Sequence, residues 1–122
     1  MPKKIVYIED DLEMTYLIKM ILERKDYEVI STNDGLEGFA LIERESPDLV
    51  LLDLMMPNID GWDIYHQIKS NENTSQIPVI IISAKAQPID KVLGLEIAKV
   101  NNYIGKPFKP QELLESIESI LN

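Results

Sequence analysis

Acidic residues, a serine and a lysine stand where short apolar runs of this sequence end. Three consecutive acids, Glu9 to Asp11, directly follow one apolar run, and Asp53 ends another. Ser83 closes a third run, and Lys106 comes just after the last of them. Carboxylates a few ångströms apart repel by roughly 4 kcal/mol per close pair at an intermediate dielectric. If the fold gathers these groups, the site must raise their pKa values or recruit cations.

A divalent ion and a lysine would provide that compensation. Glu9, Asp10 and Asp53 offer only oxygen ligands, which suit Mg²⁺ better than zinc, and Mn²⁺ is expected to substitute for it. With the ion and Lys106 in place, a phosphoryl group could be held, a carboxylate could act as its nucleophile, and Ser83 could bind a phosphoryl oxygen. The alternative is that each residue separately is a cap, a turn former or a surface charge. Their joint position at strand ends disfavours that alternative.

The elements that must position these residues alternate along the chain. Apolar runs without polar alternation predict strands buried on both faces at residues 48–53 and 79–83. Further strands are predicted at residues 4–8, 28–32 and 102–104. Helical spacing of apolar residues predicts a helix after each strand, the fourth of them over residues 89–98 through Val92, Leu93, Leu95 and Ile97. This order predicts parallel pairing and a three-layer α/β/α sandwich. Ligands bind outside the carboxyl ends of such strands, where all the residues above lie.

Length and composition limit the protein further. A chain of 122 residues is the size of one domain, so we expect a single unit over 1–122. The formal charge of -9 argues against nucleic acid or an anionic membrane as a direct partner. No cysteine, signal peptide or apolar run of membrane-spanning length occurs, which fits a cytoplasmic protein.

Five short motifs occur in a fixed order along the chain: Ile8-Glu9-Asp10-Asp11, Leu51 to Pro57, Asp60-Gly61, Ile82-Ser83-Ala84 and Lys106-Pro107-Phe108. In this set the sequence resembles the receiver domains of two-component response regulators, which are CheY-like in fold. The resemblance implies a flavodoxin-like (βα)5 fold with a five-stranded parallel sheet of order 2-1-3-4-5. It also implies a signalling domain whose only catalysis is its own phosphorylation and dephosphorylation.

The resemblance assigns roles around one phosphoacceptor, Asp53. Glu9 and Asp10, with Asp53 and the backbone carbonyl of Met55, are implied to hold Mg²⁺. Ser83 and Lys106 are implied to bind the phosphoryl group. The donor is implied to be a sensor histidine kinase or a phosphotransfer protein.

Further implied roles concern switching and lifetime. The Lys106–Pro107 peptide bond is expected to be cis. Tyr103 matches the aromatic residue that turns inward when the serine, here Ser83, moves onto the phosphoryl group. Met55 and Lys85 match positions that tune the phosphoryl lifetime, and an apolar Met55 predicts slow loss of the group. A downstream protein target is expected on the face formed by the fourth helix, the fifth strand and the fifth helix.

The sequence also departs from the family pattern. The spacing from Gly94 to Tyr103 is one residue longer than usual, so the loop before the last strand is expected to be atypical. The last helix carries Glu112, Glu115 and Glu118 where DNA-binding members show arginines that pair across a dimer. We therefore expect a monomer.

Two alternative functions remain open. One is a haloacid-dehalogenase-type phosphatase, which also uses a strand-end aspartate and Mg²⁺ but expects an acid where Met55 stands. The other is a receiver-like module that binds partners without being phosphorylated. His66, the only histidine, is expected on a solvated helix surface rather than in a phosphorelay.

Overall fold

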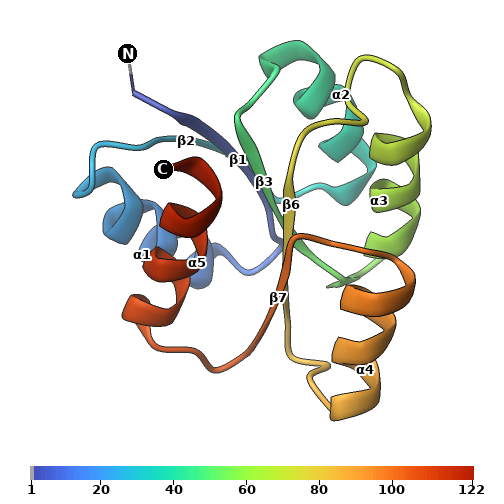
Figure 1. The fold of residues 1–122 in the computed structure, drawn as a ribbon. Helices are drawn as coiled ribbons and strands as arrows, with labels where there is room; N and C mark the ends of the chain where they lie inside the picture. The colour runs from blue at the N-terminus through green and yellow to red at the C-terminus, as the bar shows by residue number, and fades with distance from the viewer. Residues whose placement is uncertain (1) are drawn as a thin grey trace.

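A five-stranded parallel sheet in the order β2-β1-β3-β6-β7 forms the centre of the computed structural model, which describes residues 2–122 (Figure 1). Its strands are β1 (Lys4–Ile8), β2 (Glu28–Thr32), β3 (Leu49–Asp53), β6 (Val79–Ser83) and β7 (Asn102–Gly105). Counted along the chain without the two short strands β4 and β5, this is the order 2-1-3-4-5, so the predicted topology is confirmed. The register places Ile8 beside Leu52 and Asp53 beside Ile82. The strands that carry the acids and Ser83 therefore end side by side.

Helices cover both faces of the sheet. Helices α1 (Leu12–Glu23) and α5 (Pro110–Leu121) lie on one face, and α2 (Gly35–Glu45), α3 (Gly61–Ser70) and α4 (Pro88–Val92) lie on the other (Figure 1). Two apolar cores result. Successive residues of β1 alternate between them, because side chains of a strand point to opposite faces: Ile5 and Tyr7 enter the core under α1 and α5, and Val6 and Ile8 enter the other.

A two-stranded hairpin lies between β3 and α3, where no strand is predicted from the sequence. Strand β4 (Met55–Met56) pairs antiparallel with β5 (Ile59–Asp60). Gly61 follows directly, and a Cβ atom there would lie 2.6 Å from Cα of Leu54 and 2.7 Å from the carbonyl oxygen of Asp53. Only glycine allows this approach of backbone to backbone, so the hairpin returns tightly against the end of β3.

The fourth helix differs from the prediction. Instead of one α-helix over residues 89–98, α4 ends at Val92 and continues as a π-helix, η1 (Leu93–Ile97). A π-turn accommodates one extra residue in a helix, which matches the longer spacing between Gly94 and Tyr103. Lys99 then ends the helix in the left-handed region, with φ 63°.

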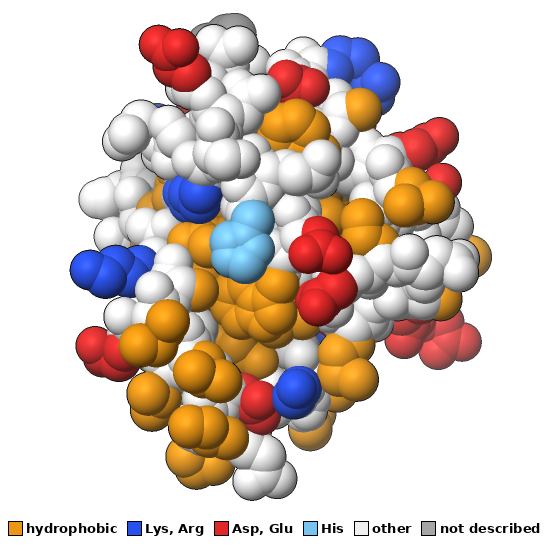
Figure 2. Space-filling view, turned by 90° about the vertical axis from the view of Figure 1, so that its right-hand side faces the viewer, with side chains coloured by type: hydrophobic (Ala, Val, Ile, Leu, Met, Phe, Trp, Pro, Cys, Tyr) orange, Lys and Arg blue, Asp and Glu red, His pale blue; other side chains and the backbone are white. Residues whose placement is uncertain are grey.

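The apolar residues that predicted this helix are exposed rather than buried against the sheet. Val92 and Leu93 are both 49% exposed, and Leu95 and Ile97 are also exposed. Figure 2 faces the side of the molecule that carries α3 and α4, and hydrophobic side chains gather on its lower part, where α4 lies in Figure 1. Gly94 packs closely against the Tyr103 ring instead, and Val100, just after the segment, enters the core. His66 is exposed in α3, as predicted.

Relief of the left-handed backbone at Lys99 should stabilise the fold. A non-glycine residue in this region is disfavoured by roughly 1–2 kcal/mol, and part of that gain is offset by the larger unfolded-state entropy of glycine. We expect Lys99→Gly to raise the free energy of unfolding in urea by about 0.5–1 kcal/mol. Lys91→Gly, placed within α4, is the control and should lower it. A destabilised Lys99→Gly variant would contradict this account.

Candidate functional site

Three carboxylates meet at the carboxyl end of the sheet. Glu9 and Asp10 follow β1, Asp53 ends β3, and one carboxylate oxygen from each lies within 4.8 Å of the others. Lys106, just after β7, reaches the same place. The sequence-predicted acids and lysine are therefore brought together, because parallel strands in register end at one edge.

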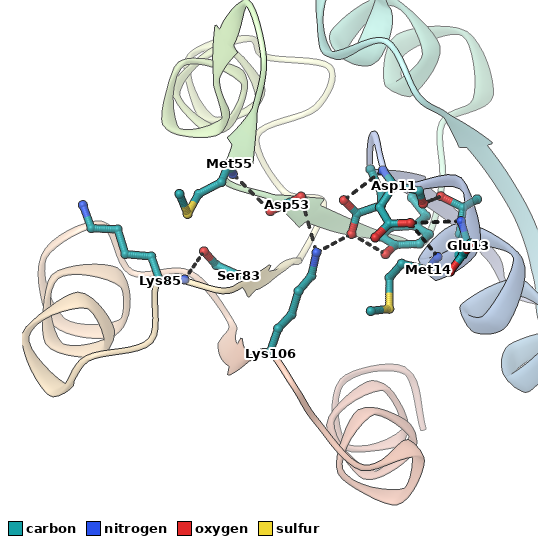
Figure 3. Close-up of polar contacts among 11 residues, drawn as sticks. Asp11, Glu13, Met14, Asp53, Met55, Ser83, Lys85 and Lys106 are labelled. Carbon is teal, nitrogen blue, oxygen red and sulfur yellow. Dashed lines mark hydrogen bonds and ion pairs between the residues drawn. The ribbon is translucent and has the colours of Figure 1, made fainter.

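Asp53 is held in a defined orientation. Its side chain is buried, its Oδ1 accepts the Met55 N–H at 3.0 Å, and its Oδ2 lies 3.5 Å from the Lys106 ammonium. Figure 3 shows Asp53 and Lys106 pointing toward each other. The backbone of the hairpin and the lysine thus share the two oxygens of one carboxylate.

Glu9 forms the closer ion pair with Lys106. The Lys106 Nζ donates to Glu9 Oε1 at 2.6 Å, and Glu9 is only 1% exposed. Burial raises the pKa of Glu9, the nearby Asp53 adds to this, and Lys106 opposes it. Burial alone would lower the pKa of Lys106, but the hydrogen bond and charge of Glu9, helped by Asp53, outweigh burial and raise it. One cation therefore serves two buried carboxylates.

The third consecutive acid has a different role. The Asp11 side chain accepts the backbone N–H groups of Glu13 and Met14 at 3.0 and 3.1 Å, so it is the N-cap of α1 (Figure 3). Capping explains Asp11 and leaves Glu9 and Asp10 for the site.

The donor set fits a hard divalent cation. All three groups offer carboxylate oxygen, the ligand that Mg²⁺ prefers, and they carry more negative charge than Lys106 neutralises. The half-buried Asp10 leaves room for waters, which Mg²⁺ retains. Glu9, Asp10 and Asp53 are the residues that could hold the ion.

Ser83, Lys85 and Tyr103 form a second group beside the acids. Ser83 is buried at the end of β6, and its Oγ accepts the Lys85 N–H at 3.0 Å. The Tyr103 hydroxyl donates to the Lys85 carbonyl oxygen, and the ring is buried, so Tyr103 faces inward in this structure. Burial raises its pKa.

The Lys85 side chain lies apart from the acids. It points away from Asp53 in Figure 3, and its ammonium lies 3.9 Å from Asp90. Met55, by contrast, borders the site: its backbone N–H donates to Asp53 Oδ1 at 3.0 Å, and its side chain is 56% exposed. Met55 is thus the better placed of the two predicted lifetime residues.

The chain enters the last helix through a cis peptide bond between Lys106 and Pro107. The Lys106 N–H donates to the Ser83 carbonyl oxygen at 2.8 Å. The backbone of Lys106 is therefore anchored to the end of β6, beside the acids its ammonium reaches.

One residue of the site was missed in the sequence. Tyr7 lies two residues before Glu9 on the same face of β1, and its hydroxyl donates to Glu9 Oε1 at 2.9 Å. From the sequence alone, Tyr7 is interpreted as one more core residue of an apolar strand. The signal that could have found it is a hydroxyl-bearing residue two positions before a buried acid.

Comparison with known proteins decides the family. Residues 5–118 match the response regulator receiver domain family. The chain belongs to this family. It is 37% identical over 121 residues to the alkaline phosphatase synthesis transcriptional regulatory protein PhoP of Bacillus subtilis, covering 99% of this chain and 49% of PhoP.

Solved receiver domains share its fold. The BeF3-activated N-terminal receiver domain of Klebsiella pneumoniae RstA is 33% identical, with a TM-score of 0.88 and 98% of each chain covered. The receiver domain of a Pseudomonas aeruginosa PAO1 sensor histidine kinase, solved with a magnesium ion in its active site cleft, is 29% identical, with a TM-score of 0.87 and 98% of each chain covered.

This receiver domain spans about half the length of the curated relatives it matches. Those relatives are named as transcriptional regulators, so the expectation that nucleic acid is no partner finds no support from them. The formal charge of -9 is that of these 122 residues alone and says nothing about the rest of such a regulator. Among residues 2–122, no helix has both the length and the apolar character that a membrane span requires.

Proposed function

We propose that this receiver domain accepts a phosphoryl group onto Asp53 from a phosphohistidine of a histidine kinase or phosphotransfer protein, in a Mg²⁺-dependent reaction. The observation that supports this most strongly is the placement of buried Asp53 between two further acids and the Lys106 ammonium, at the carboxyl end of the central strand. A cytoplasmic location is part of the proposal, since two-component donors act there and the chain has no cysteine.

The transfer is a substitution at phosphorus. A carboxylate oxygen of Asp53 forms the new P–O bond, and the donor's P–N bond breaks with its electron pair left on the imidazole, which then takes a proton. The Met55 N–H holds the other carboxylate oxygen in place. Bound Mg²⁺ would supply positive charge for the phosphoryl oxygens.

Lys106 and Ser83 act on the incoming group. The Lys106 ammonium already faces Asp53 Oδ2 and would pair with a phosphoryl oxygen there. The Ser83 Oγ accepts the Lys85 N–H, so its own O–H remains available to donate to the phosphoryl group. Formation of that bond would keep Tyr103 inward, and we propose that the surface around α4 and β7 reports this state to a protein target.

The test is incubation of the protein with acetyl phosphate and Mg²⁺, followed by intact-mass spectrometry. A phosphoryl adduct that EDTA prevents is the expected result. Turnover of acetyl phosphate without an adduct would instead indicate a hydrolase. No reaction at all would indicate a module that binds partners without phosphorylation.

The lifetime of the adduct should depend on Met55. Its thioether offers an attacking water no useful hydrogen bond, whereas an asparagine amide would. One hydrogen bond is worth about 1 kcal/mol, hence Met55→Asn should speed loss of the phosphoryl group about fivefold. Met55→Leu is the control and should decay like the wild type. Equal decay rates for all three proteins, followed by mass spectrometry, would rule out this role.

A further inference from the structure

The Glu9 carboxylate is held by two donors on the same oxygen. Oε1 accepts the Tyr7 hydroxyl at 2.9 Å and the Lys106 ammonium at 2.6 Å. Within residues 2–122, Oε2 accepts only a long contact, 3.4 Å from the Asp11 N–H. A carboxylate oxygen has two lone-pair sites, so Oε1 is fully used and Oε2 is the oxygen left for another partner.

Tyr7 can impose this arrangement because its own position is rigid. The ring has no exposed surface and packs in the core that includes Ile18, Leu22 and Leu51. A side chain so enclosed has one rotamer available, which aims its hydroxyl at the end of β1. Among residues 2–122, Glu9 is the hydrogen-bond partner of that hydroxyl.

Lys106 alone does not orient Glu9 in the same way. Its flexible stem reaches the site from beyond β7, and its ammonium is shared with Asp53 at 3.5 Å. Without the Tyr7 hydroxyl, the Glu9 carboxylate could turn and present either oxygen to the lysine. Partners that orient a metal ligand typically contribute 10–100-fold to metal affinity.

We propose that Tyr7 is a positioning residue of the cation site: its hydroxyl holds Glu9 so that Oε2 is available to a divalent ion. The inference rests on the proposed Mg²⁺ site and adds to it a residue within the α1/α5 core. It also means that the cation site is built partly from the interior of the sheet, not only from its edge.

The test is a titration of Tyr7→Phe with MgCl2, followed by the fluorescence of Trp62, the only tryptophan. Trp62 lines one surface depression with Met55, and the Met55 N–H donates to the Asp53 carboxylate at 3.0 Å. We expect the Mg²⁺ dissociation constant to rise about tenfold. Mg²⁺ should also raise the urea midpoint of Tyr7→Phe less than that of the wild type at the same Mg²⁺ concentration. The reason is that a ligand stabilises the folded state in proportion to how well it binds.

Tyr65→Phe is the matched control. The Tyr65 hydroxyl also makes one hydrogen bond, part-buried, 2.7 Å to the Ala98 carbonyl oxygen, and its ring packs in the core on the opposite face of the sheet from Tyr7. Both variants keep their rings and should fold. Tyr65→Phe should bind Mg²⁺ like the wild type, even where its stability falls.

The outcomes separate the two proposals. If the wild type shows no Mg²⁺ response in either measurement, the proposed cation site itself fails. If the wild type binds Mg²⁺ and Tyr7→Phe binds it equally well, the site stands and the role of Tyr7 is wrong. A parallel loss of affinity in Tyr65→Phe would show that general loosening is responsible and would also overturn the inference.

Discussion

Asp53→Asn is expected to abolish the phosphoryl adduct completely. The asparagine amide has the same shape and can still accept the Met55 N–H, which donates to Asp53 Oδ1 at 3.0 Å. It lacks the anionic oxygen that must attack phosphorus, and it is a weaker cation ligand. Intact-mass spectrometry after treatment with acetyl phosphate and Mg²⁺ should therefore show only the unmodified mass.

Asp60→Asn is the matched control for this experiment. Asp60 is a neighbouring acid that caps α3 through the Trp62 N–H, and asparagine caps equally well. This variant should form the adduct as the wild type does. An adduct that persists in Asp53→Asn, or disappears in Asp60→Asn, would place the phosphoacceptor elsewhere.

Lys106→Met should have the second-largest effect, on stability as well as phosphorylation. Methionine keeps most of the aliphatic stem but leaves Glu9 and Asp53 buried beside each other without their cation. Removing one partner of a buried ion pair costs about 3 kcal/mol. We expect that loss in the free energy of unfolding at neutral pH in EDTA, with Mg²⁺ restoring part of it, and little adduct from acetyl phosphate.

The loss of stability in Lys106→Met should be larger at neutral pH than at acidic pH. Burial already raises the pKa of Glu9 above its ordinary 4.5, and Lys106 opposes the rise. Without Lys106 the folded-state pKa rises further. Folding then favours the protonated acid, so the variant regains stability as pH falls toward 4.5 and loses it as pH rises through the folded pKa.

Urea unfolding from pH 4.5 to 8 checks this prediction. Lys85→Met is the control, since Lys85 is exposed and 3.9 Å from Asp90. A weak surface pair contributes at most about 1 kcal/mol. A deficit in Lys106→Met that stays constant across this pH range would show that lost packing, not uncompensated charge, is its cause.

Patterning in the sequence was enough to predict the five strands of the central sheet. The clearest are β1, β3 and β6, whose short unbroken apolar runs have few alternatives. Patterning also predicted a fourth helix, which is present as α4 and η1, but not how that helix packs. Val92, Leu93, Leu95 and Ile97 have helical spacing, yet they are exposed. Helical spacing does not say which side of a helix meets the sheet, because that depends on tertiary packing, and Val92 is exposed even before the π-turn of η1 begins.

The short hairpin β4–β5 was also invisible in the sequence. Two residues per strand carry no readable alternation, and the approach of Gly61 to the backbone of Leu54 is a tertiary contact. This hairpin places the Met55 N–H on Asp53. A local sequence pattern therefore could not predict how the carboxylate is oriented.

The sequence by itself determined which groups gather at the site. Glu9, Asp10, Asp53, Ser83 and Lys106 each lie at the end of a strand or just after it, and parallel strands end at one edge of a sheet. Only the tertiary structure decided how charge is distributed there: that Lys106 bonds Glu9 more closely than Asp53, that Asp11 serves as a helix cap, and that Tyr7 reaches Glu9 from the core. The physical reason is that strand order selects neighbours, whereas hydrogen bonds of a few ångströms depend on side-chain rotamers and packing that residue spacing does not contain.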